Sequence, residues 1–459
     1  MLRILLAAII LLSLATGFSA AQAPPDVRTL EQTYLAKAQR NIELYRKQDA
    51  VIEILDAGGR PVNGAQIEIN QVQQDFLFGC ILFPLTGTSE ANAGEHGLPA
   101  AEREQYQKRF LELFNLGVLP FYWKEYEPSP GKPRWPDFGP TIDWCNRNGI
   151  TIKGHPLVWS SPDGIPSWLA RFPEKYQERL LEARLLSTVS GYAGDVKLWD
   201  VVNEPIHVNT WEDREAKEKS YSPSECANYV EKALRWANAA NPEAKLLVNE
   251  YDVIPNRDTY RKQETPPRDR FLALVKELRR RNAPPFDVGF QAHEPRTEWF
   301  SPQDVWQAFD TFASEGFNIH ITEFIPQSSG KEITGWRHGT WTEEAQAEFA
   351  EQMLRLSFGH PSVASFNFWG LSDRDIWLPG GGLVDKDYNP KPIYTRLRKL
   401  IREEWMTRNL SLNTDEQGHA TFRGFLGKYR VHVRAPSGKE ADFDFHLGRG
   451  GEREFRFRM

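Results

Sequence analysis

Short apolar runs alternate with longer amphipathic segments from residue 76 to residue 404. The apolar runs have the length of strands, and in the segments between them apolar residues recur at helical spacing. The eight predicted strands are residues 76–80, 116–122, 150–159, 197–204, 245–251, 287–294, 318–324 and 364–370. Eight strand–helix units predict an α/β fold of the closed (β/α)₈ type, a TIM barrel. A doubly wound open sheet is the main alternative that this pattern leaves.

The two ends of the chain have a different pattern. Residues 30–47 predict a helix, and residues 51–72 contain two alternating segments around a glycine pair, which predicts a β-hairpin. Beyond residue 404 apolar and polar residues alternate again, most regularly in 420–435 and 454–459. This alternation is typical of antiparallel strands with one face exposed to solvent. Neither piece buries a core by itself. We therefore predict one small β-sandwich-like accessory module formed from N- and C-terminal strands.

The first residues have the layout of a cleaved secretory signal. Arg3 is followed by an apolar run from Ile4 to Leu12 and by the small-residue ending SAAQA. A membrane anchor is the alternative, but it needs roughly 18 apolar residues, and polar residues interrupt this run. The expected organisation is a signal peptide at 1–23, an N-terminal helix and β-hairpin segment at 24–75, the barrel at 76–404 and a C-terminal β segment at 405–459. The product is expected to be secreted, to the extracellular space or the periplasm.

Composition and charge narrow the possible partners. The 459 residues are 40% hydrophobic and 12% aromatic, which is enough for a large core, and the net charge of −6 is spread without a long single-sign run. This charge distribution gives no strongly basic surface for nucleic acid or for an anionic membrane, so we expect a neutral or weakly charged partner. The protein is also expected to be a monomer. Cys80, Cys145 and Cys226 have no metal-ligand spacing and are expected to be buried filler, with one disulfide remaining possible.

Polar and aromatic residues gather where the predicted strands end, and a TIM barrel builds its active site there. They are His155, Trp159, Asn203, Glu204, Asn249, Tyr251, Gln291, His293, Glu323 and Trp369. A single Glu in such a place is more often a loop or helix-entry residue. The joint occurrence of two Glu, two His and several amides favours catalysis instead.

Glu204 and Glu323 would face each other across the mouth of the barrel, three strands apart. Paired carboxyl groups suit glycoside hydrolysis, and a separation of about 5–5.5 Å implies retention through a covalent intermediate. Tryptophan and tyrosine rings can cover sugar faces, while amides and histidines bond the hydroxyl groups. The expected partner is therefore a polysaccharide or an oligosaccharide.

The motifs around these residues resemble a known family. GHPLVW, WDVVNEP, VNEYD, FQAHE, ITEF and FWGLSDRDIWLPGGGLVDKDYNPKP are similar, in this order, to the motifs of glycoside hydrolase family ten, the endo-β-1,4-xylanases. The resemblance covers residues 76–404. The flanking segments GRPVNGAQIEINQVQQDFLFG and TDEQGHATFRGFLGKYRVHV are similar to those that bracket the barrel in plant-type members.

The resemblance implies roles for individual residues. Glu204 corresponds to the general acid/base and Glu323 to the nucleophile of a retaining hydrolase that cleaves internal β-1,4-xylosidic bonds. Asn203 would bond the 2-hydroxyl of the sugar under attack. The other residues that it places around this sugar are His155, Gln291, His293, Trp369 and Trp377.

The chain departs from the family pattern after the second predicted strand. The family carries an Asn and a Lys there that bind the neighbouring sugar, whereas this chain reads LPFYWKEYEPSPG. Lys124 replaces that Lys only if a gap follows it; without a gap, Tyr122 takes the position. Ser160 stands where many members have His, and Glu250 where Asp is usual.

The function expected from the sequence is a retaining, endo-xylanase-like glycoside hydrolase acting on xylan or related decorated β-glycans, without metal or cofactor. Two alternatives stay open. One is a carbohydrate-binding protein without turnover, and the other is a transglycosylase on the same scaffold. The exact polymer and the preference for internal or terminal bonds stay open as well.

Overall fold

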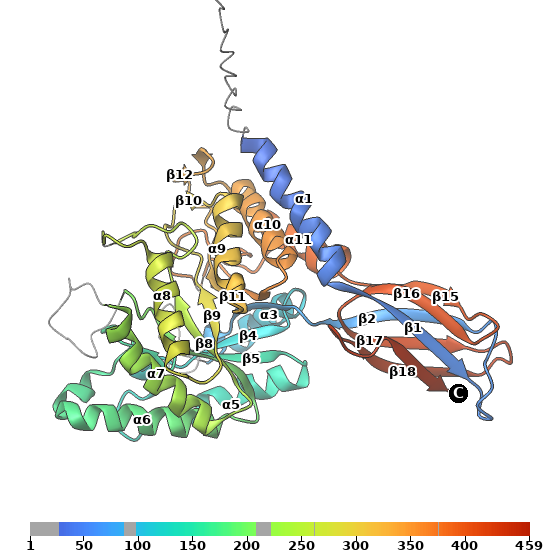
Figure 1. Ribbon diagram of the computed structural model, residues 1–459, viewed down its shortest axis with the longest axis horizontal. Helices are drawn as coiled ribbons and strands as arrows, with labels where there is room; N and C mark the ends of the chain where they lie inside the picture. The colour runs from blue at the N-terminus through green and yellow to red at the C-terminus, as the bar shows by residue number, and fades with distance from the viewer. Residues whose placement is uncertain (1–26, 87–97, 208–221, 261, 375) are drawn as a thin grey trace, which may run out of the picture.

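The computed structural model describes residues 27–86, 98–207, 222–260, 262–374 and 376–459 (Figure 1). Its largest element is a closed barrel of eight parallel strands. These are β3 (Leu77–Ile81), β4 (Leu116–Pro120), β5 (Thr151–His155), β7 (Val196–Asn203), β8 (Lys245–Glu250), β9 (Asp287–Phe290), β11 (Ile319–Phe324) and β14 (Val363–Phe368). β14 pairs with β3, and β5 pairs with β7, which closes the ring. The TIM barrel is confirmed, and the open doubly wound sheet is excluded.

Helices cover the outside of the barrel. They are α3 (Ala100–Leu111), α5 (Trp135–Arg147), α6 (Glu174–Gly191), α7 (Pro223–Ala240), α8 (Pro267–Arg280), α9 (Pro302–Ser314), α10 (Glu343–Gly359) and α11 (Pro392–Lys399). Several begin with a defined cap: Ser222 and Glu225 form a capping box on α7, and the hydroxyls of Ser301 and Thr342 accept backbone N–H groups at the starts of α9 and α10. Proline in the first turn of α7, α8 and α9 fits the same start signal.

Smaller elements lie in the loops between strands and helices. They are α2 (Phe83–Thr86), α4 (Trp123–Tyr126), β6 (Val158–Trp159), a 3₁₀ turn at Ser167–Arg171, β10 (Glu298–Trp299), β12 (Glu332–Gly335), β13 (Gly339–Thr340) and a π-helical turn at Leu400–Glu404. The predicted strand at 150–159 is therefore two elements, since the chain leaves β5 at His155 and pairs again with β7 through β6.

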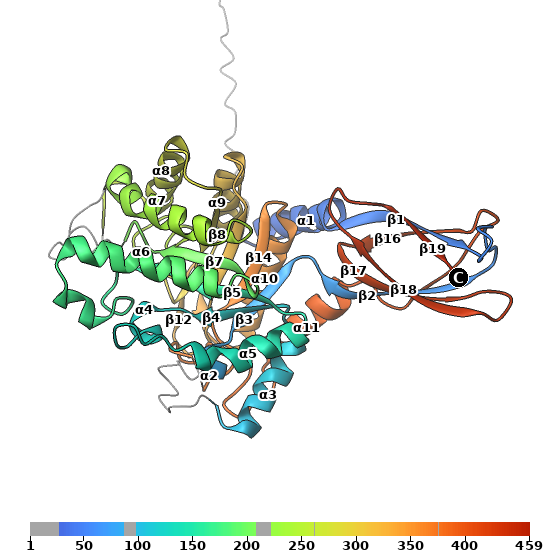
Figure 2. The same ribbon diagram turned by 90° about the horizontal axis from the view of Figure 1, so that it is seen from below.

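The terminal strands form a two-layered module beside the barrel (Figures 1 and 2). One sheet contains β1 (Lys47–Leu55), β16 (His419–Phe425) and β19 (Glu454–Arg458). The other contains β15 (Leu410–Asn413), β2 (Gln66–Gln74), β17 (Gly427–Arg434) and β18 (Glu440–Leu447). Their inner faces enclose a separate apolar core that includes Ile52, Ile67, Tyr429, Val431 and Phe445. The predicted module from both ends of the chain is confirmed.

The predicted hairpin at 51–72 is wrong. β1 pairs with β16 and β19, and β2 pairs with β15 and β17, so the two strands lie in opposite sheets. Both strands alternate between buried and exposed residues, and this alternation is the same for a hairpin partner as for a strand in the facing sheet. The glycines between them turn the chain from one layer to the other.

The N-terminal helix α1 (Val27–Tyr45) lies against the barrel helices α9 and α10 and leads into β1. It ends two residues earlier than predicted, because Lys47 already belongs to β1. The predicted signal peptide at 1–23 falls outside the described residues. Within the described residues, none of the helices combines the length and the apolar character needed to cross a membrane.

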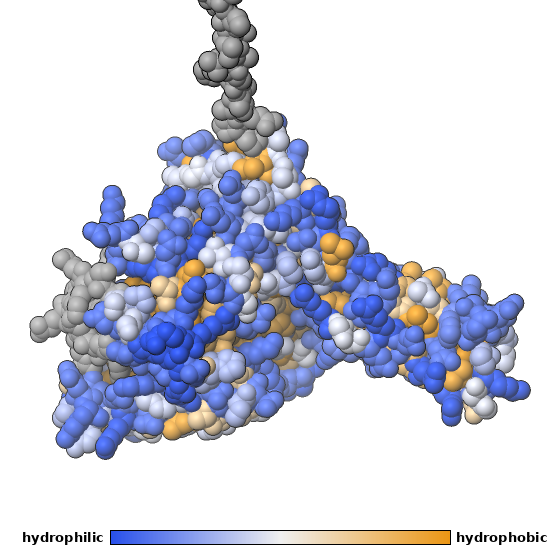
Figure 3. Space-filling view, in the orientation of Figure 1, coloured by the Kyte–Doolittle hydropathy of each residue, from blue (hydrophilic) through white to orange (hydrophobic). Residues whose placement is uncertain are grey.

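The surface in Figure 3 is mostly hydrophilic, with apolar residues in small groups. The three cysteines do not contribute to the surface, since Cys80, Cys145 and Cys226 are all buried.

Arg46 fastens the terminal module to the barrel. Its Nε donates to the carbonyl oxygen of Phe358 (2.7 Å), and its Nη2 donates to those of His360 (2.7 Å) and Val363 (2.7 Å). The guanidinium also lies 4.8 Å from the ring centre of Phe76. One side chain between α1 and β1 thus satisfies three carbonyl groups between the last turn of α10 and the start of β14.

We expect Arg46→Ala to lower the free energy of unfolding by about 3 kcal/mol, because three hydrogen bonds of about 1 kcal/mol each are lost and the carbonyls lose their partner. Urea denaturation followed by tryptophan fluorescence measures this. Arg60→Ala removes a guanidinium whose side chain is 84% exposed, so its midpoint should move little. Equal midpoints for the two variants would contradict the fastening role.

Candidate active site

A cavity of about 770 Å³ opens at the carboxyl ends of the barrel strands. It is lined by Ile81, Phe83, Tyr122, Glu125, His155, Trp159, Asp163, Asn203, Glu204, Tyr251, Tyr260, Gln291, His293, Glu294, Arg296, Glu323, Trp369, Ile376 and Trp377. Aromatic rings, amides and carboxyl groups thus line one cavity on an otherwise apolar barrel. This combination suits a neutral, hydroxyl-rich ligand.

Glu204 follows the last residue of β7, with a positive φ of 56°. The backbone N–H of Glu204 donates to the carbonyl oxygen of Asn249 on β8 (2.8 Å). Its Oε2 accepts from Nε1 of Trp159 (2.8 Å), and its Oε1 accepts from Nε2 of Gln291 (2.9 Å). The carboxyl group is therefore aimed into the cavity by donors from β6 and from the residue after β9.

The environment of Glu204 favours its protonated form. Burial is the largest cause, the hydrogen bond from Gln291 opposes it, and the negative charges of Glu250 and Glu323 add to it, so the pKa rises to about 7. A carboxylic acid with this pKa holds a proton near neutral pH and can release it.

Glu323 is part of β11 and is 5% exposed. Its Oε1 accepts from Nδ2 of Asn249 (2.7 Å). His155 and His293 face it as well, with Nε2 of His155 3.8 Å from Oε1 and Nε2 of His293 3.4 Å from Oε2. Burial would lower the pKa of His293, but hydrogen bonds and charges from Glu294 and Glu323 raise it to about 9. A protonated histidine therefore stands beside the Glu323 carboxyl group.

A chain of amides joins the two carboxyl groups. Nδ2 of Asn249 donates both to Oε1 of Glu323 and to Oδ1 of Asn203 (2.8 Å), and Nδ2 of Asn203 donates to Oε1 of Glu204 (3.1 Å). Gly289 leaves room for this chain, because a Cβ there would lie 2.4 Å from Oδ1 of Asn249. The two acids are thus held in one fixed arrangement with unlike surroundings.

A buried ion pair on the Nδ1 side of His155, away from the cavity, orients its ring. Its Nδ1 lies 2.7 Å from Oδ2 of Asp200, which also accepts from Nζ of Lys153 (2.7 Å). All three side chains are almost completely buried. Burial would raise the pKa of Asp200, but Lys153 and His155 lower it to about 2. The ionised Asp200 thus fixes which ring nitrogen of His155 faces the cavity.

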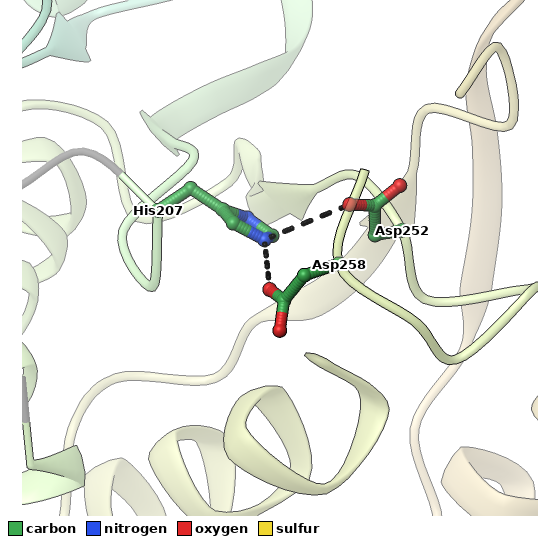
Figure 4. Close-up of side chains that lie close together, drawn as sticks. All are labelled: His207, Asp252 and Asp258. Atoms are coloured by element: carbon green, nitrogen blue, oxygen red, sulfur yellow. Dashed lines mark ion pairs between the residues drawn. The ribbon is translucent and has the colours of Figure 1, made fainter. Parts of the chain in front are cut away.

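A second buried cluster lies beside the cavity, where His207, Asp252 and Asp258 bring three possible metal-ligand atoms together (Figure 4). Its charges are already compensated. Burial would lower the pKa of His207, but Glu250, at 2.6 Å from Nδ1, and Asp258 raise it to about 9. Arg270 donates to Asp258. A protonated ring has no lone pair for a cation, so these residues form an ion-pair network that fits a metal poorly.

Comparison with known proteins agrees with this geometry. Residues 104–400 match the family model "Glycosyl hydrolase family 10". The chain belongs to this family.

Among the relatives of this family 10 chain is endo-1,4-beta-xylanase B of Thermotoga neapolitana, which is 27% identical over 68% of this chain and 88% of its own length. Endo-1,4-beta-xylanase 1 of Arabidopsis thaliana is 23% identical over 86% of this chain, which spans 37% of that longer protein. Among solved structures, xylanase 10B of Thermotoga petrophila in complex with xylobiose has a TM-score of 0.56 and 23% identity over 72% of this chain and 95% of its own. The chain is thus a hydrolase of the xylanase family, with a plant protein among its relatives.

The structure brings most of the predicted site residues of this family 10 chain into the cavity. The lining contains His155, Trp159, Asn203, Glu204, Tyr251, Gln291, His293, Glu323, Trp369 and Trp377. Asn249 was expected to bind substrate, but it is fully buried beneath the lining and bonds Asn203 and Glu323 instead. It is placed to position these groups.

Lys124 is the second predicted binding residue that lies outside the lining. Its Nζ is 3.3 Å from Oδ1 of Asp163, and its side chain is 47% exposed. Tyr122 lines the cavity instead, with its ring centre 5.4 Å from that of His155. Trp123, the next residue, is buried against Trp168. Tyr122 therefore stands in the lining, and Lys124 stands outside it.

Sequence reasoning missed part of the lining. Glu294, Arg296 and Tyr260 bond one another on one side of the cavity, and Ile81 and Phe83 close another part of it. Glu294 was visible as the last residue of FQAHE, directly after His293. Tyr260 and Arg296 lie in loops where neither period nor spacing marks them, and Ile81 and Phe83 lie just beyond the predicted strand 76–80.

Proposed function

We propose that this chain is a retaining glycoside hydrolase that cleaves internal β-1,4-xylosidic bonds in xylan or a related decorated β-glycan. The observation that carries the proposal is the pair of cavity carboxyl groups, Glu204 and Glu323, joined by amides and held in unlike surroundings. The relatives named as endo-xylanases and the relative bound to xylobiose support the same substrate class.

In the first step Glu323 attacks the anomeric carbon and Glu204 gives its proton to the glycosidic oxygen. The bond between that carbon and that oxygen breaks, the leaving sugar departs with a hydroxyl group, and the remaining sugar is an ester of Glu323. The pKa of Glu204 near 7 suits this donation at neutral pH.

In the second step water replaces the enzyme ester. Since the ester removes the negative charge of Glu323, one cause of the raised pKa of Glu204 disappears, and the Glu204 carboxylate can take a proton from water. The water oxygen then attacks the anomeric carbon and frees Glu323, with net retention of configuration.

The neighbouring residues hold the sugar and the carboxyl groups. Asn203 presents its amide between Glu204 and Asn249, in reach of a sugar hydroxyl group. The protonated His293 steadies the charge of Glu323 at 3.4 Å. Trp369 and Trp377 supply flat apolar surfaces on which a sugar ring can rest.

We expect kcat/KM on xylo-oligosaccharides to fall about tenfold per pH unit above pH 7, because Glu204 loses its proton there and its pKa is raised to about 7. Initial rates from about pH 5 to about pH 9 measure this limb. On aryl xylosides with a good leaving group the same limb should be shallow, since they need little protonation. An alkaline limb of equal steepness on both substrates would contradict the acid role of Glu204.

The substrate proposal is tested by chromatography of the products from residues 24–459 with linear xylan, glucuronoarabinoxylan and mixed-linkage glucan. Xylo-oligosaccharides of several lengths, without early accumulation of one short product, are expected from cleavage of internal bonds. Release from the glucan only would overturn the xylan proposal. The signal-like residues 1–23 lead us to propose that the enzyme acts outside the cytoplasm.

A further inference from the structure

Arg296 gives the cavity a localised positive charge away from the two acids. It is the one arginine or lysine among the described residues that line the cavity. The other charged or titratable groups in the lining are five carboxyl groups, two histidines and three tyrosines. Its side chain is 46% exposed, so the guanidinium reaches the cavity and the solvent.

Three residues from three loops fix the guanidinium. Nε of Arg296 donates to Oε1 of Glu294 (2.9 Å), and Nη2 donates to the hydroxyl oxygen of Tyr260 (2.7 Å). The guanidinium carbon lies 4.5 Å from the ring centre of Trp377. An arginine has five N–H groups in a fixed fork, and these two bonds engage two of them. Three donors remain in a group whose orientation is already set, which lowers the entropy lost when a ligand binds.

Glu294 neutralises only part of the positive charge of Arg296, because it also interacts with His293. Its Oε1 also lies 3.8 Å from Nδ1 of His293, and the hydroxyl of Tyr260 donates to the same oxygen (2.6 Å). Since the pKa of His293 is raised to about 9, Glu294 is shared between two cations at neutral pH. Arg296 therefore keeps attraction for a further anion.

Other side chains connect Arg296 to the catalytic acids. Its guanidinium contacts Trp377 and Glu294, and the Trp377 ring centre lies 5.7 Å from that of His293. His293 is the residue that lies beside Glu323, at 3.4 Å. The group that meets Arg296 must belong to a neighbouring sugar or to a side group of the chain.

Glu125 and Asp163 line another part of the cavity, from the loops after β4 and β6. Lys124 pairs with Asp163 at 3.3 Å, which offsets part of the negative charge there. An anionic side group is attracted at Arg296 and gains no comparable attraction beside these carboxylates. The charge pattern thus favours one place for such a group in the cavity.

We propose that Arg296 is a specificity-determining residue that binds the carboxylate of a uronic acid side group on the β-glycan. The planar fork of guanidinium donors matches a carboxylate, and the pair is stronger than a hydrogen bond to a sugar hydroxyl group. This inference rests on the proposed function, and it names which decorated xylan the cavity prefers.

The test compares glucuronoxylan with the same polymer after chemical reduction of its uronic acid carboxyl groups to primary alcohols. Size, linkage and branching are unchanged, so only the charge differs. For the wild-type protein we expect kcat/KM to be about five- to tenfold higher on the acidic polymer at low salt. The ratio should fall to about one in Arg296→Gln and keep an intermediate value in Arg296→Lys, which retains the charge without the fork.

Arg257→Gln is the matched control. It removes a guanidinium that pairs with Glu298 outside the cavity lining, so the wild-type ratio should persist. Circular dichroism of all variants checks that they are folded. A ratio near one for wild type, or an unchanged ratio in Arg296→Gln, would overturn the inference while cleavage of both polymers upheld the proposed function. No release from either polymer or from linear xylo-oligosaccharides would instead overturn the proposed function, and this inference with it.

Discussion

Replacing Glu323 with alanine is expected to abolish hydrolysis of every xylan and xyloside, with a loss in kcat on the order of 10⁴-fold or more. The loss is large because Glu323 forms the covalent bond to the sugar. No other carboxyl group in the lining lies between His155, His293 and Asn249. Loss of the side chain leaves room for a small external nucleophile. Azide should therefore restore turnover of an activated aryl xyloside and give a glycosyl azide of inverted configuration.

Glu277→Gln is a suitable control for this variant. Glu277 is a carboxylate on α8 that pairs with Arg280 and Arg281 on the outside of the barrel, so its replacement should leave the rates unchanged. Near-wild-type rates for Glu323→Ala, or an azide product of retained configuration, would contradict the nucleophile assignment.

Replacing Glu204 with alanine is expected to act selectively. Rates on natural xylo-oligosaccharides should fall about 10²- to 10⁴-fold, because the departing sugar hydroxyl needs a proton that Glu204 supplies. Formation of the enzyme ester from a dinitrophenyl xyloside should be slowed far less, since that leaving group departs as an anion. Hydrolysis of the ester should then limit turnover, because the base that activates water is missing.

Azide separates this variant from the first. It should attack the ester of Glu323 without needing a base, and give a glycosyl azide of retained configuration. The alkaline limb of the pH profile, which follows the pKa of about 7 for Glu204, should disappear. Equal losses on natural and activated substrates would contradict the acid/base role.

The sequence predicted the barrel well because its strands are buried on both faces. The run 116–122 is almost continuously apolar, whereas 197–204 and 318–324 combine apolar residues with a Glu at or next to their ends. Eight repeats of one unit leave little freedom of topology. The same repetition placed Glu204 and Glu323 at the mouth, since residues at the carboxyl ends of parallel strands share one edge.

The parts that the sequence did not predict depend on contacts between distant segments. Alternation in β1 and β2 is equally compatible with pairing and with facing sheets, so the hairpin was a reasonable but wrong prediction. The choice between Lys124 and Tyr122 turned on a gap that the sequence left open, and only the structure shows that Tyr122 lines the cavity while Lys124 does not. Arg296 lies in a loop, and only its contacts with Glu294 and Trp377 bring it to the cavity.

The buried supports of the site were hidden for a related reason. Lys153 and Asp200 lie inside strands where a charged side chain is unexpected, and each is explained only by the other and by His155. Glu250 was noted as a departure from the family pattern. The structure gives it a partner in His207, whose ring stacks on that of Tyr251 at 3.8 Å between centres.

The most direct test of the central claim is to trap the covalent intermediate. A 2-deoxy-2-fluoro xylobioside with a good leaving group forms the enzyme ester and hydrolyses slowly, so the labelled protein accumulates. Mass spectrometry of the intact protein and of its peptides then locates the sugar. We predict one 2-deoxy-2-fluoroxylobiosyl group per chain, attached to Glu323 in the peptide that contains ITEF. No label, or a label on another residue, would contradict the account of Glu323 as the nucleophile of a retaining hydrolase.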